Sequence, residues 1–208
     1  AIVLRKAQFL LGAARVKQFP DDNGWEVAVA GRSNAGKSSA INVITDTRGL
    51  ARISKTPGRT REINFFQIDD QRRLVDLPGY GYARVPLPVK LAWQRLMEEY
   101  FRQRRCLRGI LIVMDCRHPL ADFDQQMLQW CGHAHLPVHV LLTKADKLSR
   151  GAAAAVLHQV RGRLDGGDKL KPVVTVQLFS ALKRTGVMEV QKILANWMEI
   201  EKKKDPGI

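Results

Sequence analysis

Cysteine is scarce in this chain, and apolar runs long enough to cross a membrane are absent from it. Its 208 residues include three cysteines, Cys106, Cys116 and Cys131, with no Cys-x-x-Cys pair. This count and spacing argue against a disulfide framework and are typical of reduced cytosolic thiols. The longest apolar stretches, near residues 110–114 and 138–142, have the length of buried strands. The first residues also lack the pattern of a signal peptide, so we expect a cytoplasmic protein with no membrane partner.

Acidic residues are few beside the basic ones. The chain has 34 Lys and Arg against 20 Asp and Glu, which gives a formal net charge of +14. Lysine and arginine neutralise phosphates and release counterions, so this balance favours a nucleic acid as partner. The alternative is that the surface charge only keeps the protein soluble.

Internal repeats and low-complexity linkers are absent too, and strand-like segments alternate with helix-like ones. This order predicts an α/β fold with a mainly parallel sheet in one domain over residues 1–208. Residues 1–20 read as an N-terminal extension, in which Phe9-Leu10-Leu11 fits either a strand or a helix. The expected strands are 25–30, 63–68, 72–76, 110–114, 138–142 and 173–178, the second and third forming a hairpin around Asp69-Asp70-Gln71. The expected helices are 37–44, 89–100, 122–131, 151–164 and 187–203.

One glycine-rich loop carries the most specific signal. Gly31-Arg32-Ser33-Asn34-Ala35-Gly36-Lys37-Ser38 matches G-x-x-x-x-G-K-[ST] between a predicted strand and a predicted helix. The glycines let backbone N–H groups curl toward phosphates, and the helix N-terminus adds positive potential. Lys37 can reach the β- and γ-phosphates, and the Ser38 hydroxyl can bind Mg²⁺. The loop, with Ser39 behind it, predicts binding of a nucleoside triphosphate without choosing between ATP and GTP.

Three further segments follow in the order of a GTP site. In Asp76-Leu77-Pro78-Gly79, an aspartate at a strand end can hold Mg²⁺, and a glycine N–H can reach the γ-phosphate. Thr143-Lys144-Ala145-Asp146 follows the next-but-one strand, and its carboxylate can accept two hydrogen bonds from guanine that adenine does not offer. Phe179-Ser180-Ala181, after the following strand, fits the loop whose backbone N–H meets the guanine carbonyl. These positions select GTP over ATP, with a Walker-type ATPase or kinase as the outside alternative.

Between the phosphate loop and Asp76 lies Thr56-Pro57-Gly58-Arg59-Thr60. A threonine here is expected to close over Mg²⁺ and the γ-phosphate in the triphosphate state only. Thr60 is the first choice and Thr56 the second, and Gly58 and Arg59 are expected to lie at the nucleotide with Thr60.

The longer strings around these motifs resemble a known group. Lys55-Thr56-Pro57-Gly58-Arg59-Thr60, Asp76-Leu77-Pro78-Gly79-Tyr80-Gly81-Tyr82-Ala83 and Asp115-x-Arg117-His118-Pro119, with the phosphate loop, are similar to those of the TrmE-Era-EngA-EngB-septin GTPases. Within that group the chain resembles the bacterial EngB (YihA/YsxC) family. The resemblance implies a Ras-like domain with a six-stranded sheet, one strand antiparallel and helices on both faces. It also implies a role in late assembly of the large ribosomal subunit, with rRNA as partner, and a link to cell division.

Catalytic groups are harder to place than binding groups. Where Ras-like switches carry a water-orienting glutamine, this chain has Tyr80, so slow intrinsic hydrolysis by positioning and electrostatics is expected. The candidate catalytic residues are Lys37, Thr60 and Asn34. Relatives with asparagine at the Asn34 position can hold K⁺ beside the phosphates, so K⁺ is a candidate second cation. The alternative is that Asn34 only hydrogen-bonds its own loop.

Three functions are therefore compatible with the sequence. The first is a monomeric GTPase switch in assembly of the large ribosomal subunit. The second is an RNA-binding module in which GTP is structural. The third is a GTPase switch for a protein partner in cell division (septation).

Overall fold

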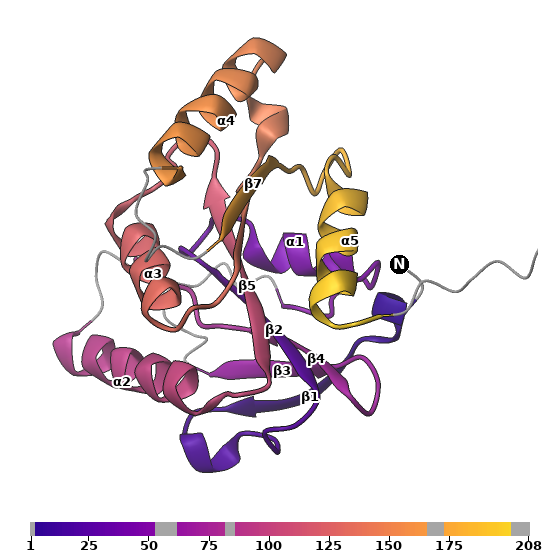
Figure 1. Cartoon of the computed structure of the whole chain (residues 1–208), viewed down its shortest axis with the longest axis vertical. Helices are drawn as coiled ribbons and strands as arrows, with labels where there is room; N and C mark the ends of the chain where they lie inside the picture. Colours follow the sequence, from indigo (N-terminus) through magenta and orange to yellow (C-terminus); the bar gives the residue numbers. More distant parts are fainter. Residues whose placement is uncertain (1–2, 53–61, 82–85, 166–172, 201–208) are drawn as a thin grey trace, which may run out of the picture.

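The computed structural model describes residues 3–52, 62–81, 86–165 and 173–200. Its centre is one sheet with the strand order β1-β3-β4-β2-β5-β6-β7 (Figure 1). The strands are β1 (Gln8–Ala13), β2 (Trp25–Gly31), β3 (Ile63–Gln67), β4 (Arg72–Asp76), β5 (Leu107–Asp115), β6 (Val138–Thr143) and β7 (Val174–Leu178). β3 is antiparallel to both of its neighbours, and all other neighbouring pairs are parallel. The predicted α/β class, mainly parallel with one antiparallel strand, is confirmed.

The sheet has seven strands, one more than the six expected. The additional strand is β1, which pairs antiparallel with β3 at the edge of the sheet. Its register shifts between Phe9 and Leu11, where a bulge accommodates the intervening residue. The local sequence fits either a strand or a helix, and pairing with β3 decides between them. The N-terminal segment therefore contributes to the same sheet as the rest of the chain.

Helices cover both faces of the sheet, as expected (Figure 1). One face carries α1 (Lys37–Ile44) and α5 (Val187–Trp197), and the other carries α2 (Leu87–Gln103), α3 (Asp122–His133) and α4 (Arg150–Leu164). Short 3₁₀ turns, η1 (Val3–Lys6), η2 (Val16–Gln18) and η3 (Ala145–Lys147), join these elements. Alternate residues of β2 feed the two cores: Val27 and Val29 pack in the α1/α5 core, and Ala28 and Ala30 in the opposite one. No described helix is long and apolar enough to span a membrane.

The last helix is shorter than expected. It ends at Trp197 rather than at residue 203, and residues 201–203 lie outside the described part. Glu199 adopts a left-handed backbone (φ 49°), which helical residues do not have. The Arg72 guanidinium donates to the carbonyls of Met198 and Glu199, each at 2.8 Å, and so binds acceptor groups left open at the helix end.

A buried charge cluster lies at the amino ends of β2 and β4. The Glu26 side chain is fully buried. Its carboxylate accepts hydrogen bonds from Arg104 (2.7 and 3.1 Å), from Arg73 (3.3 Å) and from the Tyr100 phenol (2.7 Å). The two arginines also donate to backbone carbonyls, including that of Pro20 at 2.6 Å. The cluster thus connects β2, β4, the end of α2 and the segment that precedes β2.

Candidate functional site

The predicted functional segments meet at the carboxyl edge of the parallel strands. Gly31, Asp76, Asp115 and Thr143 end the strands β2, β4, β5 and β6, which are neighbours in the order β4-β2-β5-β6. Ligands of open α/β sheets bind at this edge, because the loops that leave it diverge there. The sheet therefore brings together segments such as Gly31 and Thr143, which lie more than a hundred residues apart in the chain.

The glycine-rich loop from Gly31 to Gly36 connects β2 directly to α1. A Cβ at Gly31 would lie 2.7 Å from the Val113 carbonyl oxygen, so this position has no room for a side chain. Gly36 precedes α1 with φ 95°, a left-handed conformation that favours glycine, and Asn34 also has a positive φ of 63°. The tight path aims the start of α1, with its open N–H groups, at the space above the loop.

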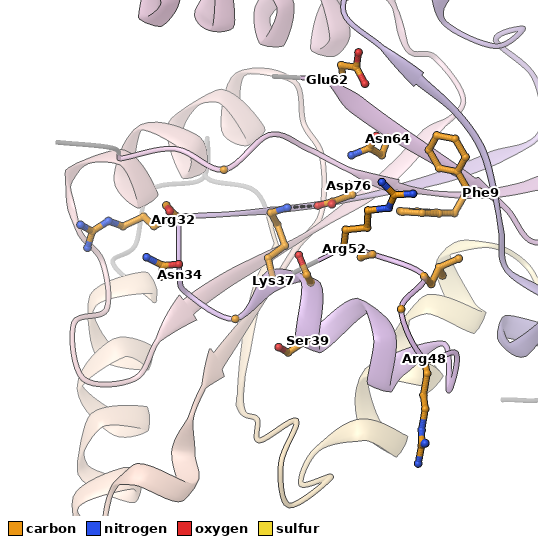
Figure 2. A pocket seen from close by; sticks show the side chains of 18 residues that line it. Phe9, Arg32, Asn34, Lys37, Ser39, Arg48, Arg52, Glu62, Asn64 and Asp76 are labelled. Atoms are coloured by element: carbon orange, nitrogen blue, oxygen red, sulfur yellow. Dashed lines mark hydrogen bonds and ion pairs between the residues drawn. The ribbon is translucent and has the colours of Figure 1, made fainter. Parts of the chain in front are cut away.

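The Lys37 amine forms an ion pair with the Asp76 carboxylate across this space, as Figure 2 shows. Both side chains are largely buried, with exposed fractions of 12% and 8%. They line a cavity of about 960 Å³ together with Ser33, Asn34, Gly36, Ser38, Ser39 and Gly79. Lys37 and Asp76, which belong to two predicted motifs and lie 39 residues apart in the chain, are therefore in direct contact.

The segment after β4 is held against the glycine-rich loop. The Leu77 N–H donates to the Val29 carbonyl (3.0 Å), and the Ser33 N–H donates to the Tyr80 carbonyl (2.8 Å). Leu77 is buried, whereas Gly79 faces the cavity, with Pro78 between them. Asp76 and Gly79 therefore line the cavity directly beside the loop.

The segment from Thr143 to Asp146 contacts the other side of the loop. The Thr143 hydroxyl lies within hydrogen-bond distance of the Ala35 and Met114 carbonyl oxygens. The Lys144 amine donates to the Asn34 carbonyl (2.6 Å) and pairs with Asp115 (3.0 Å). These contacts bind the two predicted motifs to each other through loop backbone oxygens.

Asp146 and Ser180, predicted from separate strand ends, are also neighbours. The Ser180 hydroxyl donates to an Asp146 carboxylate oxygen and accepts a hydrogen bond from the Lys183 N–H (3.0 Å). The Ala145 N–H donates to the Phe179 carbonyl (3.2 Å). The Asp146–Ser180 pair does not line the cavity at Lys37, so the site has two parts, with Lys144 and Thr143 between them.

Asp115 organises the region between these two parts. Its carboxylate binds the Arg117 guanidinium (2.7 and 2.9 Å) and the Lys144 amine. The hydrogen bonds from Arg117, followed by those from Lys144, hold the pKa of Asp115 well below its usual range, so it stays ionised. In the sequence, Asp115 stood out only as part of the string Asp115-x-Arg117-His118-Pro119, which carries the family resemblance.

Four of the predicted residues come from the segment between α1 and β3. Gly58, Arg59 and Thr60, with the alternative Thr56, lie outside the described residues.

Other residues line the cavity although no motif pointed to them. They come from the segment after α1, from β1, from β3 and from the residue just before β3: Phe9, Arg48, Gly49, Leu50, Ala51, Arg52, Glu62, Asn64 and Phe66. Figure 2 shows Arg52, Asn64 and Phe9 at the end of the cavity away from Asn34. Their spacing in the sequence does not indicate that they line the cavity, because this depends on where β1 pairs in the sheet.

Solved structures share this fold. A structure described as a probable GTP-binding protein engB has a TM-score of 0.65 and 20% sequence identity, and the match covers 85% of this chain and all of that one. A mutant of the S. thermophilus NFeoB bound to GDP has a TM-score of 0.57 and 27% identity, over 83% of this chain and 62% of that chain. The apo elongation factor SelB from Methanococcus maripaludis has a TM-score of 0.59 and 16% identity, over 88% and 35%.

A family model described as 50S ribosome-binding GTPase (MMR_HSR1) matches residues 26–144. The match covers more than half of the chain and runs from β2 through the glycine-rich loop and Asp76 to Lys144. The chain therefore belongs to the 50S ribosome-binding GTPase family.

Proposed function

We propose that this protein is an EngB-type GTPase that acts as a nucleotide-dependent switch in late assembly of the large ribosomal subunit. The observation that carries the proposal is the Lys37–Asp76 pair at the glycine-rich loop, because it places a phosphate-binding cation beside a carboxylate suited to Mg²⁺.

GTP is proposed to lie along the two parts of the site. Its phosphates contact the loop residues Gly31–Ser39, and the Gly79 N–H meets the γ-phosphate. Its guanine is bound by Asp146 and by the backbone around Ser180 and Ala181, with Lys144 beneath the base. Gly58–Thr60 are proposed to close over the triphosphate. The contacts of the Lys144 amine with the Asn34 carbonyl and with Asp115 support this placement. They fix the Thr143–Asp146 segment relative to the phosphate loop.

The donors at the cavity fit Mg²⁺. Ser38 and Asp76 line the same cavity, and hydroxyl and carboxylate oxygens are the ligands that this hard cation prefers. Bound there with the nucleotide, Mg²⁺ supplies positive charge against the phosphate oxygens. The Lys37 amine is proposed to leave Asp76 for the phosphates when GTP binds, which frees the carboxylate.

Slow hydrolysis is proposed because no side chain at the Asp76–Gly79 segment takes the place of a water-orienting glutamine. The Tyr80 side chain is buried, with 3% of its surface exposed, and does not line the cavity. Lys37 and the loop N–H groups then act by electrostatic stabilisation of charge on the phosphates.

Asn34 is proposed to bind K⁺ beside the phosphates. Its side chain is exposed, and within the described part of the chain its amide makes no hydrogen bond that would fulfil the alternative role of bracing its own loop. We expect replacement of K⁺ by Na⁺ to lower the GTP hydrolysis rate about tenfold. This is less than the roughly thousandfold or larger rate gain that an arginine finger gives in other GTPases. The Asn34→Ala variant is expected to hydrolyse GTP equally slowly in both salts. Equal wild-type rates in K⁺ and Na⁺ would remove the role.

The ribosomal partner is supported by three observations of different kinds. The family is described as ribosome-binding, one similar structure is described as a probable engB protein, and the net charge of +14 suits a polyanion. The test is co-sedimentation of the purified protein with large-subunit particles in the presence of a non-hydrolysable GTP analogue or of GDP. We expect retention on the particles with the analogue and release with GDP.

Two other results would favour the alternative functions. Binding that ignores the nucleotide and falls steeply with salt would instead indicate an RNA-binding module. Retention of a protein partner after ribonuclease treatment would indicate the switch in cell division. The Lys37→Ala variant is the control, because it keeps nearly all of the positive charge but loses the contact with the phosphates.

A further inference from the structure

Tyr80 is buried between two helices on the face of the sheet opposite α1. Its ring lies 6.3 Å from that of Trp93 in α2 and 6.1 Å from that of Phe123 in α3, measured between centroids. Its phenol donates to an Asp124 carboxylate oxygen at 2.8 Å. Asp124 is 1% exposed, and its second oxygen accepts from the Ala121 N–H at 3.1 Å. Burial raises the pKa of the Tyr80 phenol well above its ordinary value, so the phenol keeps its proton and acts as the donor.

The backbone of the same residue binds the glycine-rich loop. The Tyr80 N–H donates to the Gly31 carbonyl (3.4 Å), and its carbonyl accepts from the Ser33 N–H (2.8 Å). Arg32 and Tyr80 thereby form an isolated parallel bridge that continues the pairing of β2 with β4 beyond the ends of both strands. Tyr80 is therefore fixed to the loop by its main chain and to α3 by its side chain.

Gly79 lies between two fixed points. Before Gly79 the segment is bound to β2 through the Leu77 N–H, and after Gly79 it is bound to the glycine-rich loop through the Tyr80 backbone. Gly79 itself has no side chain to hold it and borders the cavity. Its position relative to the loop depends on these neighbours.

We propose that Tyr80 is a positioning residue for GTP hydrolysis, which acts by holding Gly79 at the γ-phosphate through its hydrogen bond to Asp124. The inference rests on the proposed GTPase function. GDP has no γ-phosphate to meet Gly79, so a loosened Gly79 affects the triphosphate alone. A purely structural tyrosine would instead change the stability of the fold and leave the preference between the two nucleotides unchanged.

The test compares Tyr80→Phe with Tyr100→Phe. Both changes remove one buried hydroxyl that donates to a carboxylate, to Asp124 at 2.8 Å and to Glu26 at 2.7 Å respectively. Tyr100 belongs to the cluster at the amino ends of β2 and β4, away from the cavity. We expect Tyr80→Phe to lower kcat and the affinity for a GTP analogue about tenfold and to leave the affinity for GDP within about twofold. Tyr100→Phe is expected to lower the melting temperature without changing kcat or the ratio of the two affinities.

Variants of Asp124 test the same bond from the other side. Asp124→Asn keeps an oxygen for the Ala121 N–H and an amide group for the phenol, so its kcat is expected to stay within about threefold of wild type. Asp124→Leu offers no polar partner to the phenol, so its loss of kcat is expected to match that of Tyr80→Phe. The double variant Tyr80→Phe/Asp124→Leu is expected to lose no more kcat than either single variant. Equal effects of Tyr80→Phe on GTP and GDP affinity, or equal kcat losses in Tyr80→Phe and Tyr100→Phe, would overturn the inference. A wild-type protein that binds but does not hydrolyse GTP would instead overturn the proposed GTPase activity.

Discussion

Changing Asp146 to asparagine is expected to lower the affinity for GTP about a thousandfold and to raise the affinity for xanthosine triphosphate. The carboxylate is proposed to accept two hydrogen bonds from guanine, and each bond to a charged group contributes about 1.5–3 kcal/mol. An amide places a donor against guanine donors, and xanthine instead offers a carbonyl that accepts from it. The structure holds Asp146 in place through Ser180, whose hydroxyl donates to it, so the changed side chain has little freedom to turn away.

Competition of unlabelled nucleotides against a fluorescent guanine nucleotide measures this change. Asp165→Asn is the matched control, since Asp165 is an exposed carboxylate just after α4 and away from the predicted site. We expect Asp165→Asn to bind GTP as the wild type does. An Asp146→Asn variant that retains wild-type GTP affinity, or a wild type that prefers ATP, would contradict the assignment of guanine to this loop.

The Glu26→Gln change is expected to cost about 3–5 kcal/mol of the free energy of unfolding. Glutamine keeps the shape of the side chain but removes the one carboxylate between Arg73 and Arg104, which leaves buried charge uncompensated. For a chain of this size the loss corresponds to a fall of roughly 6–20 °C in melting temperature. It is a large fraction of the roughly 5–15 kcal/mol that holds a typical domain folded.

Thermal and urea unfolding without nucleotide measure this loss. Glu98→Gln, an exposed change on α2, is the control and is expected to stay within about 0.5 kcal/mol of wild type. Glu26 lies five residues before Gly31 on β2, roughly 16 Å away along the strand. Nucleotide affinity of the folded Glu26→Gln protein is therefore expected to be unchanged. A loss of stability no larger than that of Glu98→Gln would show that Arg73 and Arg104 are satisfied by the backbone carbonyls alone.

Much of the fold could be predicted because its signals are local. The strand entering Gly31 and the helix leaving Lys37 follow from apolar patterning and from the glycines between them, and α1 begins and ends at the expected residues. The hairpin of β3 and β4 follows from the turn residues that separate two apolar runs. At β1 and at the end of α5 the deciding contacts are not local. There, pairing with β3 and the carbonyl contacts of Arg72 decide the outcome.

From the sequence alone the segments expected to meet a nucleotide can be predicted, because the phosphate loop, Asp76–Gly79 and Thr143–Asp146 are short and their chemistry lies in adjacent residues. Only the tertiary structure decided that Lys37 faces Asp76, that Lys144 reaches the Asn34 carbonyl, and that Asp146 meets Ser180. It also decided the direction of Tyr80, since its partner Asp124 lies 44 residues further along the chain. The physical reason is the same in each case. Backbone conformation depends on near neighbours, whereas a buried polar side chain turns toward whichever partner the packing of strands and helices brings within hydrogen-bond distance.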